Sequence, residues 1–228
     1  MRRILFLVCL PPLFFFSCRS PYEEGGTLEF ETGETVFAPT SDLFRKTESG
    51  AVRFYTNDPK YRGPSGYSLW TVFGEEPDTL ERLVGVSKSA GNNSAGYGLV
   101  ICHKTRESDG TDKLVMLTVM INNRGYYAIG KVINGSYREI KPWTRANAGG
   151  PGNYLKTGSG MENKIGVSYA GDNHYELSFN GSVIETFTDE ELPFCGGEGR
   201  SGYVVVIAPD DLNKTGVDVY FRELEGNT

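Results

Sequence analysis

Three acidic side chains, Glu76, Asp78 and Glu81, lie within six residues of one another. Two carboxylates held about 5–5.5 Å apart can cleave a glycosidic bond with retention of configuration. To act together, the acids would have to project from one face of a strand, because successive side chains of a strand alternate between its two faces. Pro77 removes a backbone donor from such a strand. We therefore interpret the segment as an acidic surface turn and predict no catalytic residue, with hydrolysis as the less favoured alternative.

Aromatic side chains are the more informative feature. They make up 12% of the chain, which has 13 tyrosines. Tyr126, Tyr137 and Trp143 come close together in the sequence, and Trp70 lies in an earlier β-rich run. Because sugar rings expose C–H faces that stack on aromatic rings, this cluster predicts a glycan-binding surface. The alternative is that the rings fill the interior of the protein, where aromatic side chains contribute much of the packing.

Two basic side chains, Lys131 and Arg138, flank the Asn134-Gly135 pair between these aromatics. If that pair joins two antiparallel strands, Lys131 and Arg138 face each other, and like charges placed opposite are destabilising. A bound acid would relieve the repulsion, and Arg138 could hold a carboxylate or sulfate through two parallel hydrogen bonds. We therefore place both residues in the predicted ligand-binding site with the aromatic cluster.

Metal and cofactor chemistry finds little support in the sequence. The chain has two histidines, His103 and His174, and no histidine–cysteine cluster has the spacing of a zinc site. Asp109 and Asp112 could offer oxygen ligands to calcium, but acids beside a glycine are also the ordinary composition of a turn. We expect no cofactor, with calcium as the alternative.

The first 17 residues are typical of an export signal. Arg2 and Arg3 precede an apolar stretch, Ile4 to Phe16, that is too short to span a bilayer as a helix. Its end, Phe15-Phe16-Ser17-Cys18, resembles the lipobox of bacterial lipoproteins. The resemblance implies cleavage before Cys18 and attachment of a diacylglyceryl group to its thiol, a good nucleophile as the thiolate. We expect residues 1–17 to be removed; simple secretion is the alternative.

Cleavage would leave the lipidated cysteine at the start of a short tether, residues 18–26, which is polar and contains one proline and two glycines. Two acyl chains hold a protein firmly, because each buried CH₂ contributes about 0.8 kcal/mol. We therefore expect lipid anchoring in the cell membrane or the outer membrane of a bacterium, facing the periplasm or the cell exterior.

Two cysteines, Cys102 and Cys195, lie in the body of the chain. Exported proteins form disulfides because their compartment is oxidising. The pair therefore predicts a bridge between distant parts of the chain, and two buried free thiols are the alternative.

The composition limits the elements that can carry these residues. Glycine (29) and proline (11) are frequent among the 228 residues, and after the N-terminal segment the longest run without either is 14 residues, 111–124. This spacing excludes long helices and predicts an all-β protein of short strands.

The net charge of −6 argues against nucleic-acid binding, which needs basic side chains to neutralise phosphates.

Short β-rich runs alternate with turn clusters throughout residues 27–228, as in a two-sheet antiparallel β-sandwich. We predict that this stretch is one domain. The run at 113–121 is apolar on both alternating faces, which indicates a strand inside a sheet. The predicted strands lie at 27–31, 51–56, 66–73, 81–88, 97–104, 113–121, 125–133, 136–141, 163–169, 174–180, 182–187, 202–208 and 217–224.

Two Asn-Gly pairs, at 134–135 and 180–181, predict β-hairpins with type I′ turns, because both central residues of that turn need positive φ. A two-residue turn also sets which residues pair across the hairpin. The expected partners are Ile129 with Ile140 and Lys131 with Arg138 in the first hairpin, and Leu177 with Ile184 and Glu176 with Glu185 in the second.

Several of these runs together resemble the concanavalin A/laminin-G-like jelly roll. They are Y-G-L-V-I-C at 97–102, the tyrosine-rich hairpin and Trp-Thr segment at 125–144, L-S-F-N-G at 177–181, and the closing pair at 202–208 and 217–224. The similarity covers roughly residues 66–224 and implies a jelly-roll sandwich. Within it, the E-x-D-x-x-E spacing at 76–81 is similar to the catalytic strand of laminarinase-type glucanases. The superfamily includes lectins, adhesion modules and glycan hydrolases, so the resemblance leaves the function open.

The sequence therefore predicts a membrane-anchored, extracytoplasmic binding module that recognises a glycan or a surface protein of the envelope or a host. A structural envelope lipoprotein without a small ligand is the main alternative, and a glycoside hydrolase is the less favoured one. The oligomeric state is left open.

Overall fold

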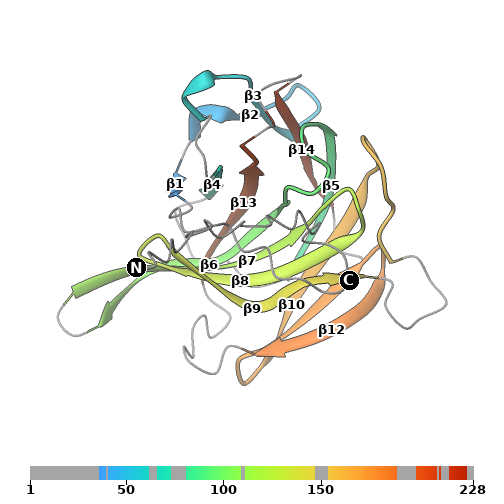
Figure 1. Ribbon diagram of the computed structural model, residues 1–228. Helices are drawn as coiled ribbons and strands as arrows, with labels where there is room; N and C mark the ends of the chain where they lie inside the picture. Colours follow the sequence, from blue (N-terminus) through green and yellow to red (C-terminus); the bar gives the residue numbers. More distant parts are fainter. Residues whose placement is uncertain are drawn as a thin grey trace, which may run out of the picture.

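The computed structural model describes residues 36–39, 41–61, 66–72, 81–108, 111–146, 154–188, 199–209, 211 and 216–224. The strands in these ranges form two seven-stranded sheets that lie face to face (Figure 1). Helix in the same ranges is limited to 3-10 turns, of which η1 (Ser41–Leu43) and η2 (Pro59–Tyr61) are described in full. The prediction of an all-β, two-sheet sandwich is confirmed.

One sheet, which we call sheet A, contains the tyrosine-rich hairpin. Its strands, in spatial order, are β1 (Val36–Pro39), β4 (Tyr67–Val72), β13 (Arg200–Ile207), β6 (Tyr97–Ser108), β7 (Thr111–Ile121), β8 (Tyr126–Ile133) and β9 (Ser136–Arg145). The pairs are antiparallel except for β1 with β4, which run parallel at one edge.

The other sheet, sheet B, is antiparallel throughout its described pairs. Its strands, in spatial order, are β12 (Ser182–Thr188), β11 (His174–Phe179), β10 (Asn163–Gly171), β5 (Glu81–Ala90), β14 (Val217–Glu223), β3 (Val52–Thr56) and β2 (Phe44–Lys46). The last strand of the chain, β14, therefore lies inside this sheet, between β5 and β3.

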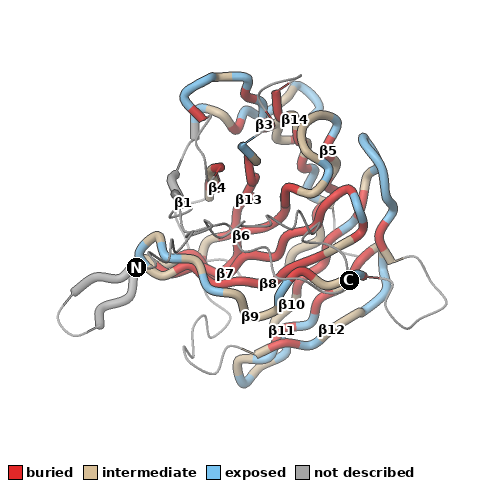
Figure 2. Tube along the Cα trace, viewed as in Figure 1, coloured by how far each residue is buried: buried red, intermediate tan, exposed pale blue. Residues whose placement is uncertain are grey.

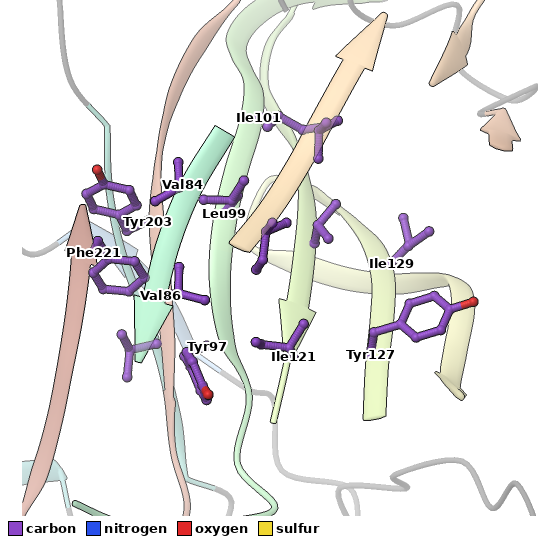
Figure 3. Packing of buried hydrophobic residues seen from close by; sticks show 14 of the residues in the cluster. Val84, Val86, Tyr97, Leu99, Ile101, Ile121, Tyr127, Ile129, Tyr203 and Phe221 are labelled. Carbon is purple, nitrogen blue, oxygen red and sulfur yellow. The ribbon is translucent and has the colours of Figure 1, made fainter. Parts of the chain in front are cut away.

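The main core lies between the two sheets and is built from every second residue of the inner strands. Leu99 of β6 and Val86 of β5 point into it from opposite sides (Figure 3). Tyr203 of sheet A stacks on Phe221 of sheet B, with ring centroids 4.2 Å apart. Such an aromatic pair adds about 0.5–1.5 kcal/mol to the gain from buried area, so these rings help to hold the sheets together.

A second apolar cluster lies on the face of sheet A that points away from sheet B, which we call the outer face of sheet A. Its buried members are Trp70, Ala95, Val100, Met116, Met120, Ala128, Val132, Trp143, Val204 and Val206. Strands β6, β7 and β13 therefore carry buried side chains on both faces, and buried residues follow one another along these strands in Figure 2. The apolar run at 113–121 forms most of β7, between β6 and β8, as predicted.

Both Asn-Gly hairpins form, and their turn residues have the positive φ that the sequence predicts. Asn134 and Asn180 each have φ of 50°. Lys131 faces Arg138 as expected, but Ile129 faces Lys141 rather than Ile140, because β9 contains an extra residue at this point. The prediction for that pair is wrong.

The second hairpin also departs from the predicted register. Leu177 faces Glu185 rather than Ile184, and Glu176 faces Thr186 rather than Glu185. The pairing shifts between Leu177 and Ser178, because β12 holds one residue more than the matching part of β11. The like-charge pair expected in this hairpin is therefore absent.

The predicted strands differ from the described ones mainly at the N-terminal side. Strands β1 and β2 were not expected, and the predicted strand at 27–31 lies outside the described residues. Strand β9 continues through Pro142 to Arg145, which is possible because β9 is an edge strand that needs no donor on its open side.

No helix in the described ranges is long and apolar enough to cross a membrane.

Candidate functional site

A row of paired residues without aromatic side chains crosses the middle of the outer face of sheet A. Each member is paired with the next across neighbouring strands, so all of them point to the same side. The row consists of Gly202 in β13, Val100 in β6, Thr118 in β7, Gly130 in β8 and Glu139 in β9. Larger aromatic side chains flank this row at both ends.

Trp70, His103 and Arg200 form a group at the β13 and β6 end. Trp70 lies in β4, and its ring packs on the His103 ring with centroids 4.9 Å apart and planes tilted by 46°. His103 follows Cys102, whose φ of 59° accompanies a break in the β6–β7 register. Arg200 pairs with His103 across β13 and β6, and its guanidinium nitrogen lies 3.2 Å from Nδ1 of the imidazole.

The hydrogen bond from Arg200 determines the state of the His103 ring. A guanidinium can only donate, so Nδ1 accepts and the neutral imidazole carries its proton on Nε2. Burial, and then the charge of Arg200, lower the pKa of His103 and favour this neutral form. Among the described residues, neither Nε2 of His103 nor Nε1 of Trp70 has a hydrogen-bond partner. Trp70 is 4% exposed and His103 is 6% exposed, so two N–H donors are buried without an acceptor.

Tyr137 and Glu139 lie at the opposite end of the row, on the edge strand β9. The Tyr137 ring lies directly over Gly130, where a Cβ atom would overlap it. Its hydroxyl interacts with the side chain of Thr118, and burial together with the charge of Glu139 raises the pKa of Tyr137. Burial also raises the pKa of Glu139. This end therefore presents a neutral phenol and a carboxyl group that is protonated more easily than usual.

The row contains one carboxylate, whereas glycoside hydrolysis in its usual form needs two that flank the scissile bond. Glu81 is exposed at the start of β5 and pairs with Ser168 in sheet B, so it belongs to the other sheet from Glu139. Glu76 and Asp78 lie outside the described residues. The row by itself therefore does not supply the usual pair of catalytic carboxylates.

The predicted aromatic residues meet on the outer face of sheet A. Tyr126 and Tyr137 are partly buried against the second apolar cluster, which also contains Trp70 and Trp143. Trp143 is 4% exposed, and its ring packs over Gly96. The sequence thus identified residues that the fold brings together, with Trp143 serving mainly as a packing element.

Lys131 and Arg138 lie on the opposite side of sheet A from this aromatic cluster, since Lys131 alternates with Gly130 along β8. Lys131 is buried, and both basic side chains already interact within the chain. Their facing charges therefore do not by themselves indicate a ligand. Close by, Lys141 donates to Glu185 over 2.6 Å and so joins β9 to β12 at the edge of the sandwich.

Cys102 is disulfide-bonded, and its partner lies outside the described residues, as do Cys18 and Cys195. The pairing of Cys102 with Cys195 stays a prediction, and Gly199 does lie against the backbone of Cys102.

The calcium alternative is likewise untested, because Asp109 is outside the described residues and the side chain of Asp112 is not described. No group of three or more metal-binding side chains occurs within the described ranges.

A second aromatic surface, on the outer face of sheet B, was missed from the sequence. Arg53 donates to both carboxylate oxygens of Asp218, over 2.8 and 3.0 Å, and lies over the rings of Tyr55 and Tyr220. Tyr55 is 41% exposed. The alternation of β3 and β14 could have indicated these residues, but only the pairing of the two strands brings them together.

The contact between His103 and Arg200 was also missed from the sequence. Each stands alone in the sequence, 97 residues apart, and no local pattern relates them. They meet because β13 inserts between β4 and β6.

Comparison with known proteins agrees with the fold. No protein-family model and no curated protein sequence matches the chain. Among solved structures, a β-glucanase of Bacillus licheniformis is similar with a TM-score of 0.51 and 11% identity, over 86% of this chain and 88% of that one. The laminarinase catalytic domain of Thermotoga maritima gives a TM-score of 0.49 and 10% identity, over 85% and 84% of the two chains. At these identities the likeness concerns the fold alone, and that fold is the concanavalin A-like jelly-roll sandwich.

Proposed function

We propose that this chain is an extracytoplasmic module that binds a glycan on the outer face of sheet A and is held at a membrane by lipid on Cys18. One observation carries the glycan-binding part: Trp70 and His103 each bury an N–H donor without an acceptor. Leaving such a donor unpaired costs about 1–3 kcal/mol. An oxygen atom of a bound ligand would satisfy these groups.

A glycan suits this surface because it combines acceptor oxygens with apolar C–H faces. Trp70 supplies an aromatic ring beside the buried donors, and Tyr126 and Tyr137 supply further rings on the same side of the sheet, four and five strands away from β4. The likeness in fold to a β-glucanase is consistent with a carbohydrate ligand. Binding is favoured over cleavage, because the row across the face carries Glu139 as a single carboxylate.

The depth of the donors limits how a ligand would be held. Trp70 and His103 are more than nine-tenths buried, so only a small group of the ligand would reach them. We therefore expect recognition of one end or one substituent of a glycan, with an affinity for one or two sugars in the μM–mM range, or roughly −4 to −8 kcal/mol.

A glycan array followed by calorimetry tests the proposal. Trp70→Phe keeps an aromatic ring but removes the donor, so binding to a glycan found on the array should weaken about fivefold or more, the equivalent of one lost hydrogen bond. Trp143→Phe is the matched control, because its indole nitrogen is not among the buried groups without a partner. Equal binding by both variants and the unmodified protein would exclude this face as the site.

A structural envelope lipoprotein is the second candidate, favoured by the burial of Trp143 and Met120 in an ordinary packed cluster. It predicts that no glycan binds. The membrane anchor is tested separately: Cys18→Ala should move the protein from the membrane fraction to the soluble one. If the unmodified protein never incorporates labelled fatty acid, the anchor does not exist, and the glycan site is unaffected.

A further inference from the structure

The buried donors on the outer face of sheet A lie next to a permanent positive charge. A guanidinium is positively charged in proteins, and that of Arg200 contacts the His103 ring. No described carboxylate forms an ion pair with Arg200. Because Nδ1 of His103 accepts from Arg200, the imidazole is neutral. The group formed by Trp70, His103 and Arg200 therefore carries a net charge of +1.

The carboxylate of the row is too distant to neutralise this charge directly. Glu139 lies in β9 and His103 lies in β6, three strand spacings away. Neighbouring strands are 4.7–4.9 Å apart, so the separation along the sheet is about 14 Å. That distance is too long for an ion pair, so Glu139 does not contact the positive group.

We propose that Trp70, His103 and Arg200 form a subsite for an anionic group of the ligand, a carboxylate or a sulfate, so that acidic glycans bind in preference to neutral ones. This inference rests on the proposed function and names its ligand class. The two buried donors and the guanidinium can only donate, and carboxylate and sulfate oxygens only accept. A sugar hydroxyl would have to direct its own proton away from all three groups.

Charge also favours an acid over a hydroxyl at this position. Hydrogen bonds between ionised partners are roughly twice as strong as those between neutral ones. The guanidinium and a carboxylate can also match each other through parallel hydrogen bonds. The subsite therefore discriminates between an acidic sugar and its uncharged counterpart that has the same ring.

Nuclear magnetic resonance can test the subsite directly. The chain has two tryptophans, so ¹⁵N-labelled protein gives two indole N–H signals, which Trp70→Phe and Trp143→Phe assign. The probes are sodium glucuronate, glucose 6-sulfate and glucose. The Trp70 signal should shift saturably with one or both acids, at a concentration at least about tenfold lower than with glucose, and the Trp143 signal should not move.

A pair of arginine variants supplies the control. Arg200→Gln should raise the half-saturating concentration of the acid about tenfold or more. Arg222→Gln should leave it unchanged, because that guanidinium pairs with Glu162 over 2.7 Å and belongs to sheet B. Signal dispersion in each spectrum shows whether the variant is folded, and the comparison of acids with glucose needs no variant.

The possible outcomes separate this inference from the proposed function. If glucose and both acids shift the Trp70 signal equally, or if Arg200→Gln has no effect, the anionic subsite is wrong while glycan binding stands. Array hits confined to neutral glycans, with binding lost in Trp70→Phe, lead to the same conclusion. If no sugar moves the signal and the array finds no ligand, the proposed function itself fails. A glucuronate shift without a sulfate shift assigns the subsite to carboxylates, and the reverse assigns it to sulfates.

Discussion

Replacing each tryptophan by phenylalanine tests whether the Trp70 nitrogen truly lacks an acceptor. Both side chains are 4% exposed and lie in the same apolar cluster, so both variants lose similar ring area. That loss is worth about 1–2 kcal/mol, the size of one or two buried methylene groups with their cavity. Trp70→Phe also removes a buried donor that costs about 1–3 kcal/mol while it is unpaired. Without ligand, Trp70→Phe should therefore be more stable than Trp143→Phe by about 1–3 kcal/mol.

Urea unfolding followed by circular dichroism measures this difference as a shift in midpoint at constant slope. In thermal unfolding, 1 kcal/mol corresponds to about 2–4 °C for a protein of this size. The same Trp70→Phe variant should bind the glycan more weakly than Trp143→Phe, so that the more stable of the two variants is the weaker binder. Equal stability of the two variants would show that the Trp70 nitrogen already has a partner, and would remove the observation on which the glycan site rests.

Three further predictions concern groups outside the Trp70 cluster. Lys88 is fully buried and donates to the carbonyl groups of Asn92 and Ala95 over 2.7 and 3.4 Å. Lys88→Met should therefore lower the free energy of unfolding, measured in urea, by about 3–5 kcal/mol. A loss below about 1 kcal/mol would contradict this prediction. Since burial raises the pKa of Glu139 in the folded state, its contribution to stability is present at low pH and is lost as pH rises through that pKa. Glu139→Gln should thus be more stable than the unmodified protein at pH 7, with the difference vanishing below about pH 4; a difference that is constant with pH would refute the reasoning. Finally, intact mass under non-reducing conditions should lack free thiols at Cys102 and Cys195, and two alkylated thiols would rule out their pairing.

Short-range patterns predicted the strands and hairpins well, because those features depend on neighbouring residues. The positive φ that Asn134 and Asn180 adopt follows from the turn chemistry of an Asn-Gly pair. Pairing beyond the turn was less predictable. The extra residues in β9 and β12 shift Ile129 and Leu177 to new partners, and a bulge forms where packing against the rest of the sheet requires it rather than where a local motif marks it.

The sequence by itself determined the all-β architecture, the strand inside the sheet at 113–121 and the gathering of Tyr126, Tyr137 and Trp143. Glycine and proline spacing and apolar alternation are sufficient for these conclusions. Only the tertiary structure decided which residues pair beyond the hairpin turns, and therefore which side chains lie next to one another on each face of the sheet.

Tertiary structure alone also brought His103 to Arg200 and to the ring of Trp70. These residues are far apart in the chain, and they meet because β13 pairs with both β4 and β6. That pairing is favoured by hydrogen bonds along two strands and by burial on both faces of the sheet, and these energies depend on the whole sheet rather than on any segment of it.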